Sequence, residues 1–201
     1  MKQLFASFVF ILATSLPALA DDPSGIHLGT PIYGGTGCPN GTASAVLSPD
    51  ATSLSILFDQ YVVDAGGTTG KQLNRESCNV AIPVHVPQGL SVSVFQIDYR
   101  GFNSLPYGAY ARFNVEYFFA GTQGPSYVKT FYGQLEDNYD INNSLVQSSI
   151  VWSPCGQDVV LRTNSSMIVQ TNGTMDAAES TVDSVDLRSG LIYHLQWQTC
   201  E

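Results

Sequence analysis

Hydrophobic and polar residues alternate along most of this chain, and this period of two is the feature that most restricts its fold. In Tyr110–Phe119, every second residue from Ala111 onward is hydrophobic. Asn79–Pro87 and Leu191–Gln198 show the same alternation. Side chains of a β-strand point alternately to its two faces, so this pattern predicts strands with one buried face. No stretch shows a comparably clear helical period.

Two irregularities are expected within these strands. Leu90–Tyr99 changes phase at Val94-Phe95, and a one-residue bulge there would keep the hydrophobic side chains on one face. Pro83 has no N–H group to donate to a neighbouring strand. The strand that contains Pro83 is therefore expected at a sheet edge or at a bulge.

Further strands are expected between short turns rich in Gly, Pro, Asn, Ser and Asp. They are Ser44–Leu47, Leu54–Val63, Tyr127–Gln134, Ser144–Trp152, Val159–Arg162, Met167–Thr171 and Thr181–Asp186. A single helical turn is expected at Met175–Ser180. Many short strands at this spacing predict an all-β fold, an antiparallel β-sandwich of jelly-roll type.

The first twenty residues have the pattern of an export signal. Lys2 precedes a nearly unbroken apolar run from Leu4 to Leu16, and Ala18-Leu19-Ala20 is a small-x-small cleavage site. The run is shorter than the roughly 20 residues that a membrane span needs. We expect residues 1–20 to be a signal peptide and residues 21–201 to form one secreted, extracellular β-sandwich domain, with no membrane attachment after cleavage.

The cysteine content agrees with an oxidising compartment. The four cysteines are Cys38, Cys78, Cys155 and Cys200, an even number that allows three pairings. We favour Cys38–Cys78 with Cys155–Cys200, because these bonds would staple the two ends of the domain separately. No C-x-x-C spacing occurs, so zinc clusters and thioredoxin-type redox sites are not expected.

Four sequons also suit an exported protein. Their asparagines are Asn40, Asn142, Asn164 and Asn172, and N-glycosylation would place them on exposed turns.

Charge and motifs exclude several function classes. The chain has 17 Asp+Glu against 8 Lys+Arg, a formal net charge of −9, which argues against binding nucleic acid or anionic lipid. Neither G-x-S-x-G nor H-E-x-x-H occurs. Glu136–Asn143 is rich in oxygen ligands but lacks calcium-loop spacing, so it is expected to be a solvated turn. His85 and His194 are expected to be exposed, and we expect no metal site and no cofactor.

The aromatic residues are unevenly distributed, and most of them lie between Tyr99 and Tyr139. Tyr110 and Phe118 fall on the polar face of their strand, beside Arg112. Exposed aromatic rings on a polar sheet face could bind sugar rings or a protein partner, unless a second layer or a long loop covers them.

Three further candidates are charged. Asp59 lies between apolar neighbours on one strand face, so it must be paired or exposed at an edge. Asp98 and Arg100 could form a structural pair. Asp59 and Asp98 would suit glycan hydrolysis if both faced one cleft.

Several short motifs, in order, resemble a secreted family known as domain of unknown function 4360. They are Tyr33-Gly34-Gly35-Thr36-Gly37-Cys38-Pro39, Leu57-Phe58-Asp59-Gln60-Tyr61, Cys78-Asn79-Val80, Pro87-Gln88-Gly89, Asp98-Tyr99-Arg100-Gly101, Trp152-Ser153-Pro154-Cys155-Gly156 and Gln196-Trp197-Gln198-Thr199-Cys200. The resemblance covers about Ile26 to Cys200. It implies a small exported protein of fungal or bacterial type with its four cysteines paired, and it assigns no catalytic residue.

These observations favour a secreted, non-catalytic protein that binds an extracellular glycan or protein. Tyr110, Phe118, Arg112, Asp59, Asp98 and Arg100 are the candidate binding residues. A glycan-active enzyme that uses paired carboxylates is the first alternative, and an effector-like protein that acts on a host protein is the second. We expect a monomer.

Overall fold

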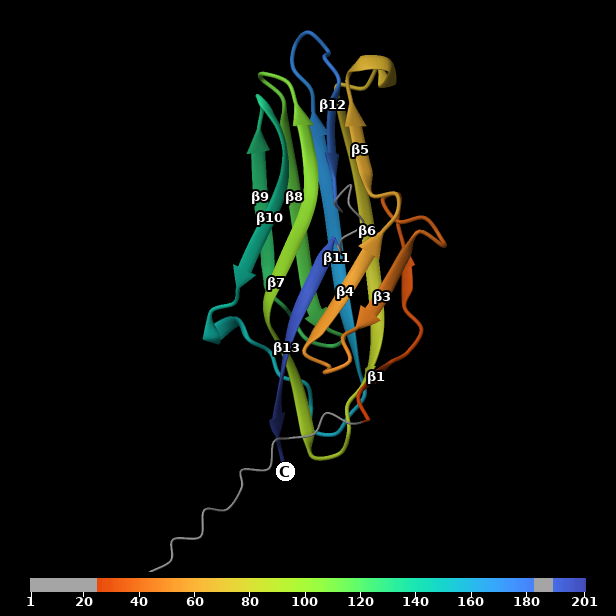
Figure 1. The fold of residues 1–201 in the computed structure, drawn as a ribbon, viewed down its shortest axis with the longest axis vertical. Helices are drawn as coiled ribbons and strands as arrows, with labels where there is room; N and C mark the ends of the chain where they lie inside the picture. The colour runs from red at the N-terminus through yellow and green to blue at the C-terminus, as the bar shows by residue number, and fades with distance from the viewer. Residues whose placement is uncertain (1–24, 183–189) are drawn as a thin grey trace, which may run out of the picture.

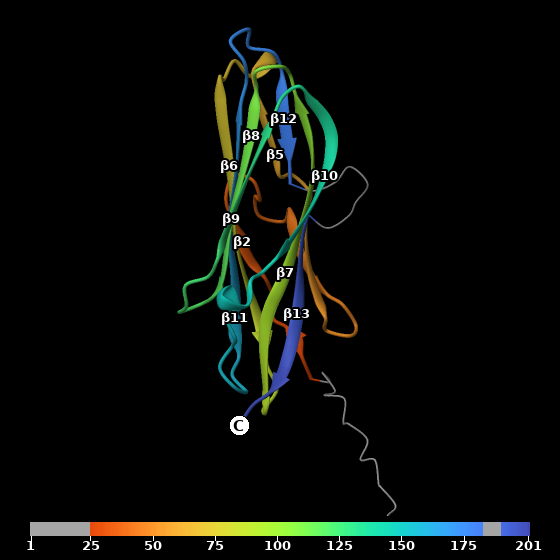
Figure 2. The same ribbon diagram turned by 90° about the vertical axis from the view of Figure 1, so that its left-hand side faces the viewer.

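Two antiparallel sheets pack face to face in the computed structural model, which describes residues 25–182 and 190–201 (Figures 1 and 2). The prediction of an antiparallel β-sandwich is confirmed. The expected signal peptide, residues 1–20, lies outside the described residues.

The first sheet has six strands in the order β1-β6-β11-β8-β9, and β2 also pairs with β6. Its strands are β1 (His27–Leu28), β2 (Ile32–Gly34), β6 (Leu73–His85), β8 (Tyr110–Phe119), β9 (Ser126–Tyr132) and β11 (Val159–Gln170).

The second sheet has seven strands in the order β3-β4-β13-β7-β12-β5, and β10 pairs with the other edge of β7. Its strands are β3 (Ala43–Leu47), β4 (Ser53–Phe58), β5 (Val62–Ala65), β7 (Leu90–Leu105), β10 (Leu135–Ser144), β12 (Ala178–Thr181) and β13 (Leu191–Thr199). Two short 3₁₀ helices, η1 (Gly67–Thr69) and η2 (Gln147–Ser149), lie in connections. No helix among the described residues is long and apolar enough to cross a membrane.

The core lies between the sheets and is built from the inward positions that the alternation predicts. Its largest fully buried side chains include Tyr61, Tyr99, Tyr193 and Phe113. Tyr99 meets Phe113 edge-on, with ring centroids 5.4 Å apart, so aromatic packing joins β7 of one sheet to β8 of the other.

The bulge expected at Val94-Phe95 is confirmed. On β13, Leu195 pairs with Val94 while His194 pairs with Gln96, so Phe95 is the extra residue. Phe95 is 38% exposed, and the inward alternation resumes at Ile97.

Pro83 lies where the edge pairing of β6 is interrupted. β1 and β2 pair with β6 on either side of Pro83, and the Gly29 N–H donates to the Pro83 carbonyl at 2.8 Å. The N–H and C=O of one residue in an antiparallel strand point to the same side. The missing N–H of Pro83 therefore faces this break, and the ladder to β11 stays intact.

Some strand boundaries were predicted wrongly. The expected strand Leu54–Val63 is divided into β4 and β5 by a turn, whereas Val159–Arg162 and Met167–Thr171 are joined in one strand, β11. Ser144–Trp152 is not a strand, since it holds η2 and a single bridge between Trp152 and Ser93.

Two local predictions near the polar loops were also wrong. Glu136–Asn143 is not a turn but most of β10, paired with β7 over its whole length. Met175–Ser180 holds no helical turn, because β12 begins at Ala178. Of the expected strand Thr181–Asp186, residues 183–186 lie outside the described residues.

Both favoured disulfides form. Cys38–Cys78 and Cys155–Cys200 have Cα–Cα distances of 5.3 and 5.8 Å, and they confirm the preferred pairing.

Candidate functional site

Four strands of the six-stranded sheet, β9, β8, β11 and β6, present an outer surface to solvent. Figure 2 shows this sheet with the seven-stranded sheet against only one of its faces. Residues directly opposite on neighbouring strands share a face. We call one end of this outer surface the platform, formed by Tyr132, Tyr110, Gln170 and Leu73 in one row and Thr130, Arg112, Ile168 and Arg75 in the next.

Two tyrosines lie side by side on the platform. Tyr132 is directly opposite Tyr110 and is 73% exposed. Tyr110 is half-buried, and its hydroxyl donates to Gln170 Oε1 at 3.1 Å. Because Phe131 on the opposite face of β9 is buried in the core, the strand period directs Tyr132 outward. The pair therefore offers one fixed ring and one accessible ring.

Two arginines occupy the adjacent row. Arg112 and Arg75 are both opposite Ile168, on its two sides, and both are exposed. Two inter-strand spacings separate their Cα atoms, about 10 Å. Arg112 is also the next outward residue after Tyr110 on β8, so ring and guanidinium groups are neighbours on the platform.

Phe118, the third candidate on β8, is not part of the platform. It shares the outer face but lies eight residues from Tyr110, about 26 Å along the strand, opposite Arg162. Phe118 is half-buried, and Gly124 of the β8–β9 loop packs close to its Cβ.

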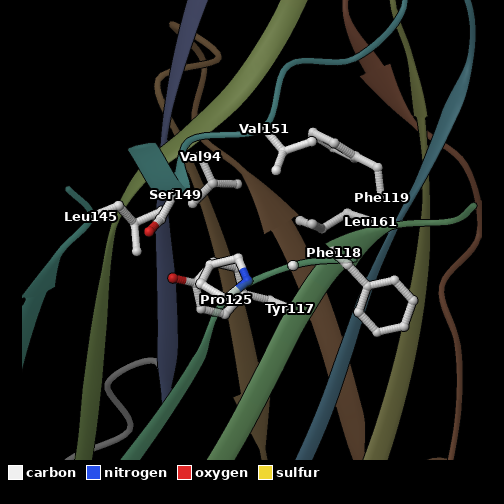
Figure 3. A pocket seen from close by; sticks show the side chains of 10 residues that line it. Val94, Tyr117, Phe118, Phe119, Pro125, Leu145, Ser149, Val151 and Leu161 are labelled. Carbon is white, nitrogen blue, oxygen red and sulfur yellow. The ribbon is translucent and has the colours of Figure 1, made fainter. Parts of the chain in front are cut away.

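A small apolar cavity opens beneath that far end, between the sheets (Figure 3). Its volume is about 20 Å³, and its lining includes Val94, Leu145, Val151 and Leu161. In Figure 3 the Phe118 ring points away from these side chains. Pockets for drug-sized ligands begin near ~300 Å³ and carry convergent polar groups, so this apolar cavity is a weaker candidate than the platform.

Asp98 is the centre of a polar cluster on the outer face of the other sheet. It is only 6% exposed, and its carboxylate accepts hydrogen bonds from His194 Nε2 at 2.8 Å, Asn142 Nδ2 at 2.9 Å and Gln96 Nε2 at 2.9 Å. Burial alone would raise the pKa of Asp98, but the hydrogen bonds from Asn142, His194 and Gln96 outweigh it and hold this pKa below its ordinary value. His194 is therefore half-buried and paired rather than simply exposed.

Arg100 does not form the pair expected with Asp98. Its Nε donates to Asp140 Oδ2 at 3.1 Å, because β10 places Asp140 directly opposite Arg100. His85, in turn, pairs with Asp158 through Nδ1 at 2.7 Å.

Asp59 and Asp98 do not meet. Asp59 is exposed in the turn after β4, whereas Asp98 is two strands away, in the row of Ile192 and Ser55. The strand geometry places the Cα atoms of the two residues about 16 Å apart, too far for the ~5–9.5 Å carboxyl separation that glycoside hydrolysis requires.

A different pair of carboxyl groups was missed by sequence reasoning. Glu179 of β12 lies directly opposite Asp64 of β5, beside a groove that Phe102 and Ser104 also line. Burial, the charge of Asp64 and a hydrogen bond between the two side chains raise the pKa of Glu179. A pair in hydrogen-bond contact is closer than glycosidase geometry allows, and among the described residues no three His, Cys, Asp or Glu side chains gather as a metal site.

The four sequons occupy two kinds of position. Asn40 and Asn172 lie in turns, whereas Asn142 and Asn164 lie on β10 and β11. Asn172 Nδ2 donates to the Tyr107 carbonyl and to Asp176 Oδ2, so a structural role uses the amide that a glycan would modify. Glycosylation at all four sites stays a prediction.

Comparison with known proteins places the chain among secreted relatives. It is 37% identical over 182 residues to an uncharacterized secreted protein of Arthroderma benhamiae, covering 90% of this chain and 74% of the relative. Among solved structures it is similar to TmCBM61 in complex with β-1,4-galactotriose, at 11% identity, a TM-score of 0.27, and coverage of 89% of this chain and 91% of the other. This last likeness is too slight to support any statement about function.

Residues 24–200 match the domain of unknown function DUF4360. This span contains nearly all of the sandwich and both disulfides. The resemblance seen in the ordered sequence motifs is thus confirmed, and the chain is a secreted protein that belongs to the DUF4360 family.

Proposed function

We propose that this protein binds glycan chains outside the cell, through the platform. The observation that carries the proposal is the cross-strand pair of Tyr132 and Tyr110 on an open sheet face. The apolar face of a sugar ring packs well against an aromatic ring, and tyrosine adds a polar hydroxyl at the rim of the contact. Tyrosine has only two side-chain torsions, so ordering the 73% exposed ring of Tyr132 on binding costs little conformational entropy.

The surroundings of the two rings supply the hydrogen bonds that sugar hydroxyls need. Gln170 and Thr130 offer an amide and a hydroxyl, and Arg112 offers guanidinium donors, all in the same two rows. These groups come from three adjacent strands, so their spacing is set by the sheet rather than by flexible loops. Such a row of polar groups beside rings favours recognition of an extended chain over recognition of a single sugar.

The test is a binding measurement on oligosaccharides with the wild-type protein and Tyr132→Ala. Isothermal titration against a panel of plant and microbial cell-wall oligosaccharides should show at least one ligand. Loss of the exposed ring should weaken that binding about tenfold or more, which corresponds to an aromatic contact worth about 1.4 kcal/mol.

Phe95→Ala is the matched control. Phe95 is also partly exposed, but it lies on β7 of the seven-stranded sheet. Its removal should leave affinity unchanged. If no oligosaccharide binds, or if Phe95→Ala and Tyr132→Ala weaken binding equally, the platform is not the binding site.

A further inference from the structure

The charged residues of this sandwich are divided between its two outer faces. The outward positions of β6, β8, β9 and β11 carry Arg75, Arg112 and Arg162 against one carboxylate, Glu116. The outward positions of the other sheet carry one arginine, Arg100, against five carboxylates: Asp64, Asp98, Glu136, Asp140 and Glu179. In a chain with a net charge of −9, the platform therefore lies on the more basic face.

We infer that the glycan bound by the platform is a polyuronate, a chain whose sugar units carry carboxylates. This inference rests on the proposed glycan-binding function and specifies its substrate class. An acidic protein repels a polyanion at long range, so two guanidinium groups beside the stacking rings give the platform local attraction for one kind of chain.

The two platform arginines are available to a ligand. Among the described residues, neither Arg75 nor Arg112 makes an ion pair with an acidic side chain, whereas His85, Arg100 and His194 each do. A guanidinium group presents a planar fork of N–H donors that matches a carboxylate with two parallel hydrogen bonds.

The arrangement of these groups suits a carboxylated chain. Arg75 and Arg112 stand about 10 Å apart across the strands, with the apolar Ile168 between them. This spacing exceeds a single ring, so the two forks can hold carboxylates on different units of one chain. Tyr110 and Tyr132 lie in the adjoining row, where they can stack against a ring while Arg112 holds its carboxylate.

A titration with tetragalacturonate and with its fully methyl-esterified form tests the inference. The two probes share rings and linkages, and the ester replaces each charged carboxylate by a neutral methyl ester. The wild-type protein should bind the acid more tightly than the ester, and the difference should shrink with added salt. Arg75→Gln with Arg112→Gln should weaken binding of the acid about tenfold, since exposed ion pairs each contribute a few tenths to about 1 kcal/mol, and should leave binding of the ester nearly unchanged.

Arg162→Gln is the matched control. It removes one charge of the same kind from the same face, half of the charge that the double variant removes, but it lies six residues from Ile168 along β11, about 20 Å away. Its effect on a four-unit ligand should be below twofold. A loss of affinity per charge removed that is equal for Arg162→Gln and for the double variant would show a general charge effect and would overturn the inference.

The two proposals fail in different ways. If the ester binds as tightly as the acid and Tyr132→Ala weakens both, the polyuronate inference is wrong while the platform remains the glycan site. A sulfated tetrasaccharide that binds as tightly as the acid would also overturn it, because the platform would then select charge and not carboxylate. If neither probe nor any neutral oligosaccharide binds, both the glycan-binding proposal and the polyuronate inference are wrong.

Discussion

A buried carboxylate on the outer face of the seven-stranded sheet accepts hydrogen bonds from three side chains. Asp98 accepts hydrogen bonds from Gln96 on its own strand, Asn142 on β10 and His194 on β13. Each donor is held by strand pairing, so the carboxylate joins three strands through groups that would otherwise face water. A buried charge that loses such partners is costly.

At this residue scale we predict a specific acid sensitivity. The pKa of Asp98 lies below its ordinary value, so the unfolded chain binds a proton more readily than the folded chain. The contribution of Asp98 is then fully present above the unfolded pKa, near ~3.9, and is lost as pH falls through the folded pKa. Asp98→Asn should lower the free energy of unfolding by about 1–3 kcal/mol at pH 7. The difference in this free energy between the variant and wild type, the gap, should narrow towards about pH 2.

Urea denaturation of both proteins at a series of pH values measures this gap. Asp140→Asn is a suitable control, because Asp140 makes one exposed ion pair with Arg100, worth at most about 1 kcal/mol. A gap for Asp98→Asn that is constant with pH would mean that the carboxylate is not protonated in this range and that the proposed linkage is wrong.

Individual elements are joined by close contacts that sequence patterns do not reveal. Gly101 of β7 lies directly opposite Tyr139 of β10. The Tyr139 ring passes over Gly101, and its hydroxyl donates to the Thr181 carbonyl of β12 at 2.7 Å. One side chain thus ties the strands on both edges of β7 together.

At the element scale, Gly101→Ala should break this tie. A Cβ at Gly101 would lie 2.1 Å from the Thr181 carbonyl oxygen and 2.4 Å from the Tyr139 hydroxyl, so the variant should lose about 1–3 kcal/mol as an overpacked site. Gly34→Ala in β2 is the control, because nothing lies within 4 Å of its added methyl group, and it should change stability by less than about 0.5 kcal/mol. Thermal and urea unfolding measure both variants. If Gly101→Ala and Gly34→Ala lose the same stability, the close contact assigned to Gly101 is wrong.

Features set by neighbours in sequence could be predicted, whereas features set by the pairing of distant strands could not. Alternation located β8 and β13 and the bulge at Phe95 because those features depend on neighbours in sequence. β10 was missed because its run of Glu, Asp and Asn disfavours strands locally, and only pairing with β7 makes it one.

For the platform, period two placed Tyr110 and Arg112 outward, but their partners required the register of distant strands. Tyr132 and Arg75 come from β9 and β6, and no local pattern says which strands are neighbours. For the same reason Asp98 was considered with Arg100, whereas its partners Asn142 and His194 lie 44 and 96 residues away.

On the scale of the whole molecule, the two disulfides close loops that do not overlap in sequence. Cys38–Cys78 spans 40 residues and Cys155–Cys200 spans 45. They also lie far apart in space: Cys78 is within β6, whereas the Cys200 N–H donates to Gly89 in the turn beyond the end of β6, more than about 20 Å along the strand. The bonds therefore staple two separate parts of the sandwich, the middle of β6 and the end that holds the turn after β6.

Because the two disulfides close separate loops, their contributions to the free energy of unfolding should add. Each pair of cysteines replaced by alanine should cost about 2–4 kcal/mol, because an open loop gives the unfolded chain more conformations. Strands of the first loop pair with strands of the second, β6 with β11 and β4 with β13, but the loops share no residues and the bonds themselves lie more than about 20 Å apart. The cost of removing both bonds should therefore equal the sum of the two within about 0.5 kcal/mol. Urea denaturation of the two double variants and of the quadruple variant tests this expectation. A combined cost well below the sum would contradict this expectation, because it would mean that one bond already restricts the segment closed by the other.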